Sequence, residues 1–254
     1  MDQDHVKKRP DNRPPIVVAH RGDAINFPEN TIGALRGAVA CGVHHLEFDV
    51  QLTADRIPVL LHDESLLRTS GIDQIVTASI STELRRLSVG EADRFGDSFC
   101  REYLPTLSDA LAALPVQNLT VFVELKRQSL RAFGRRRVLD AVLPVLRGTQ
   151  HNIVLVSFDR RVLQYVRAQS DYPIGFVLSS YDENAITQIV QLSPEYVFCN
   201  EHRLPAADAP LWWGNWAWVI YEITSVDQAR QLATRGATHV ESMDACRLER
   251  GLRL

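Results

Sequence analysis

Short apolar runs alternate with amphipathic segments along this chain, and that alternation limits the folds open to it. A β-α-β unit favours parallel strands, because a crossover helix returns the chain to the same edge of the sheet. The predicted strands end at His20, Glu47, Glu124, Ser157, Leu178, Asn200, Ile223 and Ser242. Eight such strands in 254 residues predict an α/β fold of the TIM (β/α)₈ barrel type. A doubly wound open sheet is the main competitor, but no GxGxxG follows the first strand.

One connection departs from this alternation, between Val50 and Val59. It is too short for a crossover helix, so the chain must fold back as an antiparallel strand. A turn centred near position 55 would place His62 roughly opposite Asp49. Local sequence alone therefore predicts a histidine beside a carboxylate.

The segment 64–105 interrupts the alternation, with one helix predicted near 82–87. A long irregular segment inside a compact domain is more often a functional insertion than a plain connection. We therefore expect a mobile N-terminal tail at 1–14 and one barrel domain at 15–254 that carries this insertion.

Composition limits the binding partners and the cellular compartment that we expect for this protein. The net charge of −3 gives no general attraction to nucleic acid, and the N-terminal segment lacks the apolar core of a signal peptide. No run approaches the ~20 apolar residues of a membrane-spanning helix, so stable membrane insertion is not expected. Cys41, Cys100, Cys199 and Cys246 form no CxxC pair, which predicts free buried thiols in a reducing compartment. These features predict a cytoplasmic protein and leave a homo-oligomer open.

Carboxylates at two predicted strand ends indicate a metal site. Glu47 and Asp49 are two residues apart on one strand and share a face, where they repel unless a cation lies between them. An isolated pair of this kind is usually an exposed edge of a sheet, but barrel strands have no exposed edge. Glu124 could complete a three-carboxylate site for a divalent cation, although a structural ion pair between Glu124 and Lys126 is the simpler alternative.

Histidines and further cations follow the same strands. His20 and His62 could form a general acid and base pair, or they could bind metal. Three carboxylates with few nitrogens suit Mg²⁺ or Ca²⁺ better than zinc. Arg21 offers a fork for phosphate oxygens, and Lys126 offers positive charge to an anionic substrate. The set suits hydrolysis of a phosphate ester, but carboxylate-rich barrels also perform aldol and enolisation chemistry.

A series of short motifs resembles one known family. They are HRG at 20–22, PENT at 28–31, ExDVxxTxD at 47–55, PVLLHD at 58–63, RTSG at 68–71, PTL at 105–107 and ELK at 124–126. This series resembles the glycerophosphodiester phosphodiesterase family. The resemblance implies a TIM barrel with a small insertion after the second-strand hairpin. It also implies metal-dependent hydrolysis of small glycerophosphodiesters to sn-glycerol 3-phosphate and an alcohol.

The resemblance assigns a role to each matching residue. It gives acid–base transfer to His20 and His62, binding of one divalent cation (Mg²⁺ or Ca²⁺) to Glu47, Asp49 and Glu124, and contact with the substrate phosphate to Arg21 and Lys126. The family's proposed route passes through a cyclic phosphate formed by the neighbouring glycerol hydroxyl.

The C-terminal third departs from the family pattern. The chain reads YEIT at 221–224 where the family commonly shows WTVN, and ESMD at 241–244 where it commonly shows a TDxP-like sequence. Tryptophans at 212–218 are expected near the barrel mouth, either as core packing or as a wall for an apolar or choline-like head group. Two alternatives remain: a related barrel phosphodiesterase acting on lysophospholipids, and a catalytically silent barrel that binds phosphorylated ligands.

Overall fold

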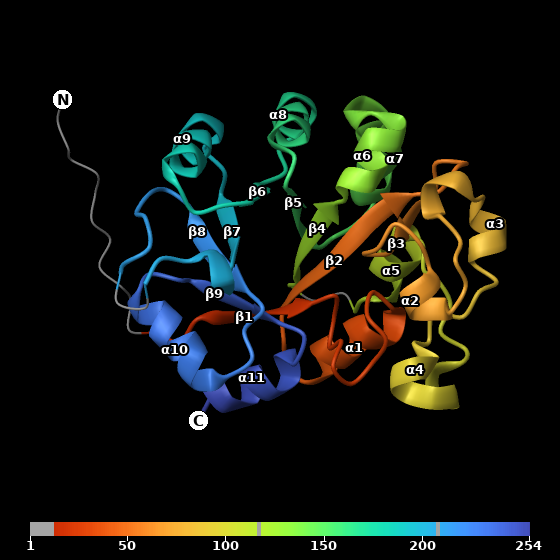
Figure 1. Cartoon of the computed structure of the whole chain (residues 1–254), viewed down its shortest axis with the longest axis horizontal. Coiled ribbons are helices and arrows are strands. Elements are labelled where there is room, and N and C mark those ends of the chain that lie inside the picture. The colour runs from red at the N-terminus through yellow and green to blue at the C-terminus, as the bar shows by residue number, and fades with distance from the viewer. Residues whose placement is uncertain (1–12, 116–117, 207–208) are drawn as a thin grey trace.

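The computed structural model describes residues 13–115, 118–206 and 209–254, and the expected tail at 1–14 lies mostly outside them. Eight parallel strands close into a barrel, because β1 pairs with both β9 and β2 (Figure 1). These strands are β1 (Ile16–His20), β2 (His45–Leu52), β4 (Thr120–Leu125), β5 (Asn152–Ser157), β6 (Ile174–Val177), β7 (Tyr196–Asn200), β8 (Ala217–Tyr221) and β9 (His239–Ser242). The predicted TIM barrel is confirmed.

Helices surround the strands on the outside of the barrel (Figure 1). They are α1 (Ile32–Ala40), α5 (Leu107–Ala113), α6 (Arg127–Phe133), α7 (Arg135–Leu146), α8 (Arg160–Gln169), α9 (Glu183–Leu192), α10 (Val226–Thr234) and α11 (Ala245–Leu252). Side-chain caps begin several of them: Thr31 accepts from the Ala34 N–H, and Asp159 accepts from the Val162 N–H. The Asp159 cap lies two residues after β5 and so fixes the turn at the carboxyl end of that strand. None of the helices in the described ranges is long and apolar enough to cross a bilayer.

Apolar side chains fill the middle of the barrel interior, and charged side chains gather at the carboxyl ends of the strands. A buried cluster of Val18, Phe122, Val154, Val156, Val177, Phe198 and Val219 fills the interior. Because side chains alternate along a strand, the residue two positions beyond each of these points the same way. His20 therefore follows Val18, and Glu124 follows Phe122, on the inner face of the barrel. The alternation thus stacks a polar layer on an apolar one.

The antiparallel strand β3 (Pro58–Leu60) folds back along β2 as predicted. The register pairs Val50 with Leu60, so Asp49 lies opposite Leu61, whose N–H donates to the Asp49 carbonyl at 3.1 Å. The turn is centred at position 55, as predicted, and this centre places Leu61 directly opposite Asp49. His62 follows Leu61, one residue beyond the exact pairing, and stays in the neighbourhood of Asp49 as expected.

The segment between β3 and α5 is more ordered than the sequence indicated. It contains α2 (Leu67–Ser70), α3 (Ser81–Leu84), α4 (Ala92–Phe95) and the 3₁₀ turns η1 (Val76–Ala78) and η2 (Gly96–Phe99). Seven apolar side chains form a small separate core beneath them: Val59, Leu61, Leu66, Val76, Leu84, Val89 and Leu104. Helices of three or four residues are too short to show a 3.6-residue period, which is why the prediction of a single helix was wrong.

The tryptophan segment packs on the outside of the barrel, between β7 and β8. The only helical element described in this connection is the 3₁₀ turn η3 (Glu201–Arg203). The Trp212 ring stacks on Tyr181 with centroids 3.6 Å apart, and Trp218 Nε1 donates to the Trp212 carbonyl. A cavity of about 610 Å³ lies between this segment, residues 13–16 and residues 236–238. These neighbours precede β1 and β9, so the expected position near the barrel mouth is wrong.

A disulfide between Cys41 and Cys246 joins the end of α1 to the start of α11, while Cys100 and Cys199 are free. The prediction that all the cysteines are free thiols is therefore wrong for this pair. The two residues are 205 positions apart, and only closure of the barrel brings α11 beside α1 (Figure 1). Disulfides are typical of oxidising compartments, so the expectation of a cytoplasmic protein loses its support from free thiols.

We expect removal of this disulfide to destabilise the protein, because a long loop of the unfolded chain is no longer closed. The double variant Cys41→Ala/Cys246→Ala should lose about 2–5 kcal/mol of unfolding free energy in urea titrations. The variant Cys100→Ala, at an exposed free cysteine, is the matched control and should behave as wild type. Thiol titration of the denatured, unreduced protein should find the two free thiols Cys100 and Cys199. Four reactive thiols would contradict this structure.

Candidate active site

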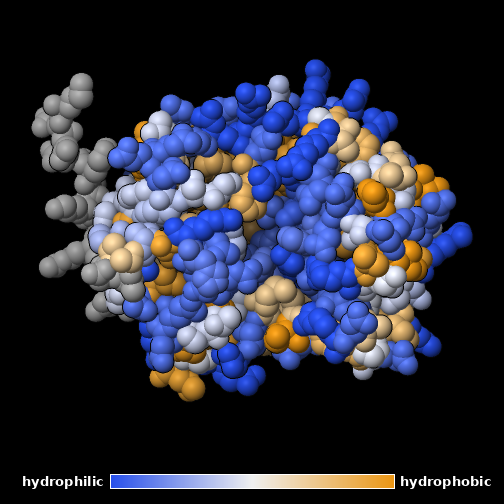
Figure 2. All heavy atoms as spheres, in the orientation of Figure 1, coloured by the Kyte–Doolittle hydropathy of each residue, from blue (hydrophilic) through white to orange (hydrophobic). Residues whose placement is uncertain are grey.

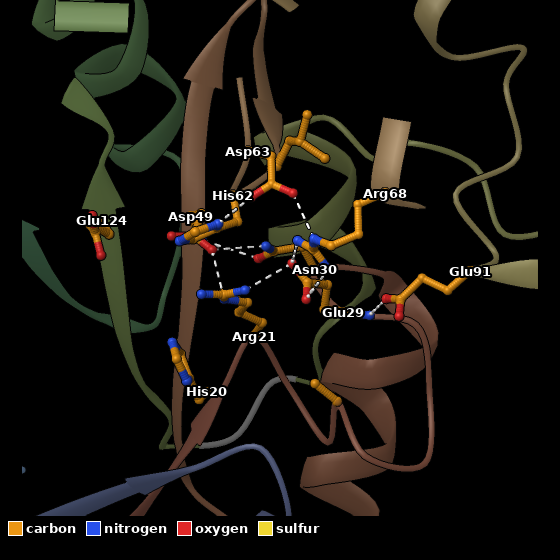
Figure 3. Close-up of polar contacts among 12 residues, drawn as sticks. His20, Arg21, Glu29, Asn30, Asp49, His62, Asp63, Arg68, Glu91 and Glu124 are labelled. Carbon is orange, nitrogen blue, oxygen red and sulfur yellow. Dashed lines mark hydrogen bonds and ion pairs between the residues drawn. The ribbon is translucent and has the colours of Figure 1, made fainter. Parts of the chain in front are cut away.

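The charged layer at the carboxyl ends of the strands brings the predicted site residues together, and Figure 3 labels five of them: His20, Arg21, Asp49, His62 and Glu124. The strand register places His20 beside Glu47 and Asp49 beside Glu124. Lys126 follows β4 directly. Figure 2 shows hydrophilic residues over most of the face presented in this view, including the rim of its central hollow.

The Asp49 carboxylate is the centre of an ion network. Its Oδ1 lies 2.9 Å from Lys126 Nζ, and its Oδ2 lies 3.1 Å from Arg21 Nε. Asn30 Nδ2 donates to Oδ2 at 2.9 Å, and Asn30 Oδ1 accepts from the Asp49 N–H. Burial alone would raise the pKa of Asp49, but Lys126 and then Arg21 outweigh it and hold that pKa well below its usual range. Asp49 is therefore ionised at neutral pH.

The backbone turn at the end of β1 places the Arg21 side chain in this network. Arg21 and Gly22 both have positive φ, at 59° and 83°, and turn the chain sharply at the end of β1. A Cβ at position 22 would lie 2.5 Å from the Ala34 carbonyl carbon, so only glycine allows this turn to pack against α1. The Arg21 N–H also donates to Glu47 Oε2 at 3.1 Å.

Positive charge neutralises the other carboxylates of this layer less completely than it neutralises Asp49. Burial, followed by repulsion from Asp49 and Glu241, raises the pKa of Glu47 well above its ordinary value. Burial also raises the pKa of Glu124, although Lys126 Nζ lies 3.0 Å from its Oε1. Within the described ranges, Glu47 Oε1 is buried without a hydrogen-bond partner. Unless they hold a proton, buried and mutually repelling carboxylates of this kind need a further cation.

A divalent cation fits this need. Glu47, Asp49 and Glu124 each offer one oxygen, and these oxygens lie within 4.8 Å of one another. A carboxylate has about four lone-pair sites, so Asp49 can bind a cation and keep its contacts with Lys126 and Arg21. An all-oxygen donor set matches Mg²⁺ or Ca²⁺.

His20 is buried between the cations and the carboxylates. Its Nε2 lies 4.0 Å from Glu47 Oε2, and its Nδ1 is buried without a partner among the described atoms. Burial, and then the charge of Arg21, lowers the pKa of His20 well below its ordinary value. His20 is therefore neutral at physiological pH and can accept a proton.

His62 is held by a chain of charged groups that reaches into the segment after β3. Its Nδ1 lies 2.7 Å from Asp63 Oδ1, and Arg68 Nε donates to Asp63 Oδ2 at 2.6 Å. Burial alone would raise the pKa of Asp63, but hydrogen bonds from Arg68 and His62 lower it overall. An ionised Asp63 can only accept, so Nδ1 carries the proton and Nε2 of His62 is left for other chemistry. Gln51 Nε2 further donates to the carbonyls of residues 61–63.

Glu29 connects the two sides of the site (Figure 3). Its carboxylate accepts both Arg68 Nη1 and Nη2, at 2.8 and 2.7 Å, and Arg21 Nη1 at 3.0 Å. Its N–H donates to Glu91 Oε1 at 2.7 Å. Arg68 and Glu91 both belong to the segment after β3, so that segment positions Arg21 and His62 together.

Sequence reasoning missed several residues that the structure brings to the site. Glu241 lies on β9 and is buried beside Glu47, but its strand end was read only as a departure from a motif. Its alternation with His239 on the inner face was the available signal. Asp63 and Arg68 were present in the quoted motifs without a role, because their contacts depend on the fold of the segment after β3.

The YEIT sequence at 221–224, which differs from the family pattern, begins close to the site at Tyr221. Its ring centroid lies 6.4 Å from that of His20, at the end of β8. Burial raises the pKa of Tyr221 to about 12, so its hydroxyl stays protonated at neutral pH. Tyr221 therefore lies beside the His20 ring at the carboxyl end of β8.

These features define a TIM barrel with a candidate metal-binding and phosphate-binding site at the carboxyl ends of its strands. Residues 20–208 match the sequence model of the glycerophosphoryl diester phosphodiesterase family, and the chain belongs to that family. The matched range includes the His20 motif, the β2–β3 hairpin and Lys126.

Two curated relatives show the extent of the similarity. A glycerophosphodiester phosphodiesterase of Caldanaerobacter subterraneus is 38% identical over 158 residues, which cover 62% of this chain and 63% of the relative. Glycerophosphodiester phosphodiesterase 1 of Bos taurus is 30% identical over 175 residues, which cover 68% of this chain and 48% of the relative. The matches thus span about half to under two thirds of the relatives' own length.

Solved structures support the same fold over nearly the whole chain. A phosphodiesterase of Oleispira antarctica, in complex with the product sn-glycerol-3-phosphate, aligns with a TM-score of 0.83 at 23% identity and covers 95% of this chain and 98% of its own. A putative glycerophosphoryl diester phosphodiesterase of Silicibacter pomeroyi aligns with a TM-score of 0.82 at 23% identity and covers 96% of this chain and 95% of its own.

The carboxylate layer predicts an unusual pH dependence of stability without metal. The raised pKa of Glu47 means that the folded state keeps a proton that the unfolded chain releases above about pH 4.3. Stability of the metal-free protein should therefore fall as pH rises from that value through the raised pKa. Because a divalent cation binds the ionised form, the gain in melting temperature on adding Mg²⁺ or Ca²⁺ should be larger near about pH 8 than near about pH 5.5.

Differential scanning fluorimetry with and without chelator measures this gain. The variant Glu47→Gln should flatten the pH dependence, whereas Glu83→Gln, an exposed control, should keep it. A metal-induced gain that is equal at both pH values would contradict the proposed electrostatic origin.

Proposed function

We propose that this chain hydrolyses glycerophosphodiesters to sn-glycerol 3-phosphate and an alcohol, with the help of a divalent cation. The observation that carries the proposal is the convergence of Arg21, Lys126, two histidines and a carboxylate cluster at one end of the barrel. Membership of the glycerophosphoryl diester phosphodiesterase family supports the reaction class.

In this proposal, Glu47, Asp49 and Glu124 hold Mg²⁺ or Ca²⁺. When bound, the cation supplies positive charge that stabilises the phosphoryl oxygens as negative charge develops on them. The buried, unpartnered Glu47 Oε1 and the mutual repulsion of the carboxylates support this assignment.

Arg21 and Lys126 bind the substrate phosphate in our proposal. Asp49 contacts both cations, so their side chains are oriented before a substrate arrives. Their side chains are only 12% and 9% exposed, so little water competes with a bound phosphate. Such preorganisation costs no reorganisation at the moment of reaction, which favours the transition state over the ground state.

The different environments of the two histidines suggest different roles. His20 is neutral because burial and Arg21 lower its pKa, so it suits a base that accepts the proton of the attacking hydroxyl. His62 Nδ1 lies 2.7 Å from Asp63 Oδ1, which orients the ring, so His62 suits an acid that protonates the departing alcohol. The roles reverse when water opens the cyclic phosphate, as microscopic reversibility requires.

His62 also suggests where the alcohol leaves. Its side chain is 34% exposed, whereas that of His20 is 11% exposed. A departing group on the His62 side therefore faces solvent, and head groups of different size can be accommodated there. The glycerol end then lies toward His20 and Tyr221.

The experiment that tests the function uses metal-stripped protein with glycerophosphocholine, glycerophosphoethanolamine and lysophosphatidylcholine. We expect release of glycerol 3-phosphate from the first two substrates only after Mg²⁺ or Ca²⁺ is restored. His62→Ala should lower kcat about 10²–10⁴-fold, because general acid catalysis is lost. His202→Ala, at an exposed histidine of η3, is the matched control and should keep wild-type activity.

Three outcomes contradict the proposal. Release of glycerol 3-phosphate that is independent of metal would exclude the metal role. Activity retained in His62→Ala would exclude the assigned acid. Hydrolysis of lysophosphatidylcholine alone would instead support the related phosphodiesterase that acts on lysophospholipids.

A further inference from the structure

We propose that Glu241 is an additional carboxylate ligand of the divalent cation, which it binds together with Glu47. This inference deepens the metal site of the proposed function and rests on that site binding a cation. Glu241 lies outside the three carboxylates that the family resemblance assigns to the metal.

The strand register brings Glu241 to the cluster from the side opposite Glu124. β9 and β2 flank β1 in the barrel, and both Glu241 and Glu47 lie on inner faces near the carboxyl ends. His20, Glu47 and Glu241 each offer one ligand atom, and these three atoms lie within 4.8 Å of one another. Glu47 therefore belongs to two groups of potential ligands, one toward Glu124 and one toward Glu241.

The Glu241 carboxylate is buried without compensation. It is 3% exposed, and its Oε1 has no hydrogen-bond partner in the part of the chain that is described. Glu47 Oε1 is likewise buried and has no hydrogen-bond partner among the described residues. A buried polar atom without a partner is costly, and a buried carboxylate is more costly still. Two such oxygens in one group point to a ligand that supplies positive charge between them.

The contrast with Asp49 argues that the missing partner is a cation from outside the chain. Asp49 already contacts Lys126, Arg21 and Asn30, so the cations that the chain itself provides gather on that side. Within residues 13–115, 118–206 and 209–254, the Glu241 carboxylate has no comparable contact, although it is part of the same buried layer. A divalent cation bound at Glu47 would reach Glu241 without moving Lys126 or Arg21 from Asp49.

An added carboxylate also affects the choice of metal. Ca²⁺ takes six to eight oxygen ligands in flexible geometry, whereas Mg²⁺ requires a near-ideal octahedron and usually keeps several waters. Glu241 should therefore contribute more to the affinity for Ca²⁺ than to that for Mg²⁺.

Isothermal titration calorimetry of metal-stripped protein with CaCl₂ or MgCl₂ alone tests the inference without any substrate. Glu241→Gln keeps the size of the side chain and removes its charge. We expect it to weaken Ca²⁺ binding at least about tenfold, as loss of a metal-supporting group typically does, and to weaken Mg²⁺ binding less. Its metal-free form should melt no lower than wild type, because a buried uncompensated charge is removed.

Glu222→Gln is the matched control. Glu222 contributes to the electrostatic environment of Glu241 but belongs to neither group of potential ligands. It should therefore leave the affinity for both cations within about twofold of wild type, since a single charge outside the site changes binding only modestly.

The inference is overturned if Glu241→Gln binds Ca²⁺ as tightly as wild type, or if Glu222→Gln weakens binding equally. A change in the pH–rate profile with unchanged metal affinity would also overturn it, since Glu241 would then act on His20 instead. Failure of the proposed function remains distinguishable from failure of this inference. If the protein binds Ca²⁺ through Glu241 but releases no glycerol 3-phosphate, the proposed reaction is contradicted and the role of Glu241 as a metal ligand stands.

Discussion

The contact of Asp49 with Lys126 and Arg21 is the interaction on which the rest of the site depends. Three different strands deliver these groups: β2 carries Asp49, Arg21 follows β1, and Lys126 follows β4. The contacts form only when β1, β2 and β4 pair in the observed register. Pairing of β1, β2 and β4 therefore also fixes the two cations that we propose bind phosphate.

This network divides the charged layer into two functionally different sides. On one side, Asp49 is neutralised by the chain's own cations, and those cations remain fixed for an anionic ligand. On the other side, Glu47 and Glu241 are buried without enough positive charge. The first side suits phosphate and the second suits a divalent cation, so both parts of a phosphate-ester site follow from one uneven distribution of charge.

Much of the fold and site could be predicted from sequence, because both depend on strict alternation within short strands. The site residues near Glu47 and His62 followed from strand ends and one hairpin, whose turn is centred at position 55 as predicted. Glu241 was missed because its strand reads as a mixed run, so its alternation with His239 does not by itself show which of the two faces points into the barrel. The disulfide of Cys41 with Cys246 could not be predicted, because nothing local links residues 205 positions apart. The tryptophan segment was misplaced because sequence order does not show which end of the barrel a long connection covers.

The most direct test of this account is a crystal structure of the protein with Mn²⁺ and glycerol 3-phosphate, with the metal located by its anomalous scattering. We predict an anomalous peak bound to Glu47 and a phosphate group that contacts Arg21 and Lys126 while both remain bonded to Asp49. An anomalous peak away from Glu47, or a phosphate bound without either cation, would contradict the account.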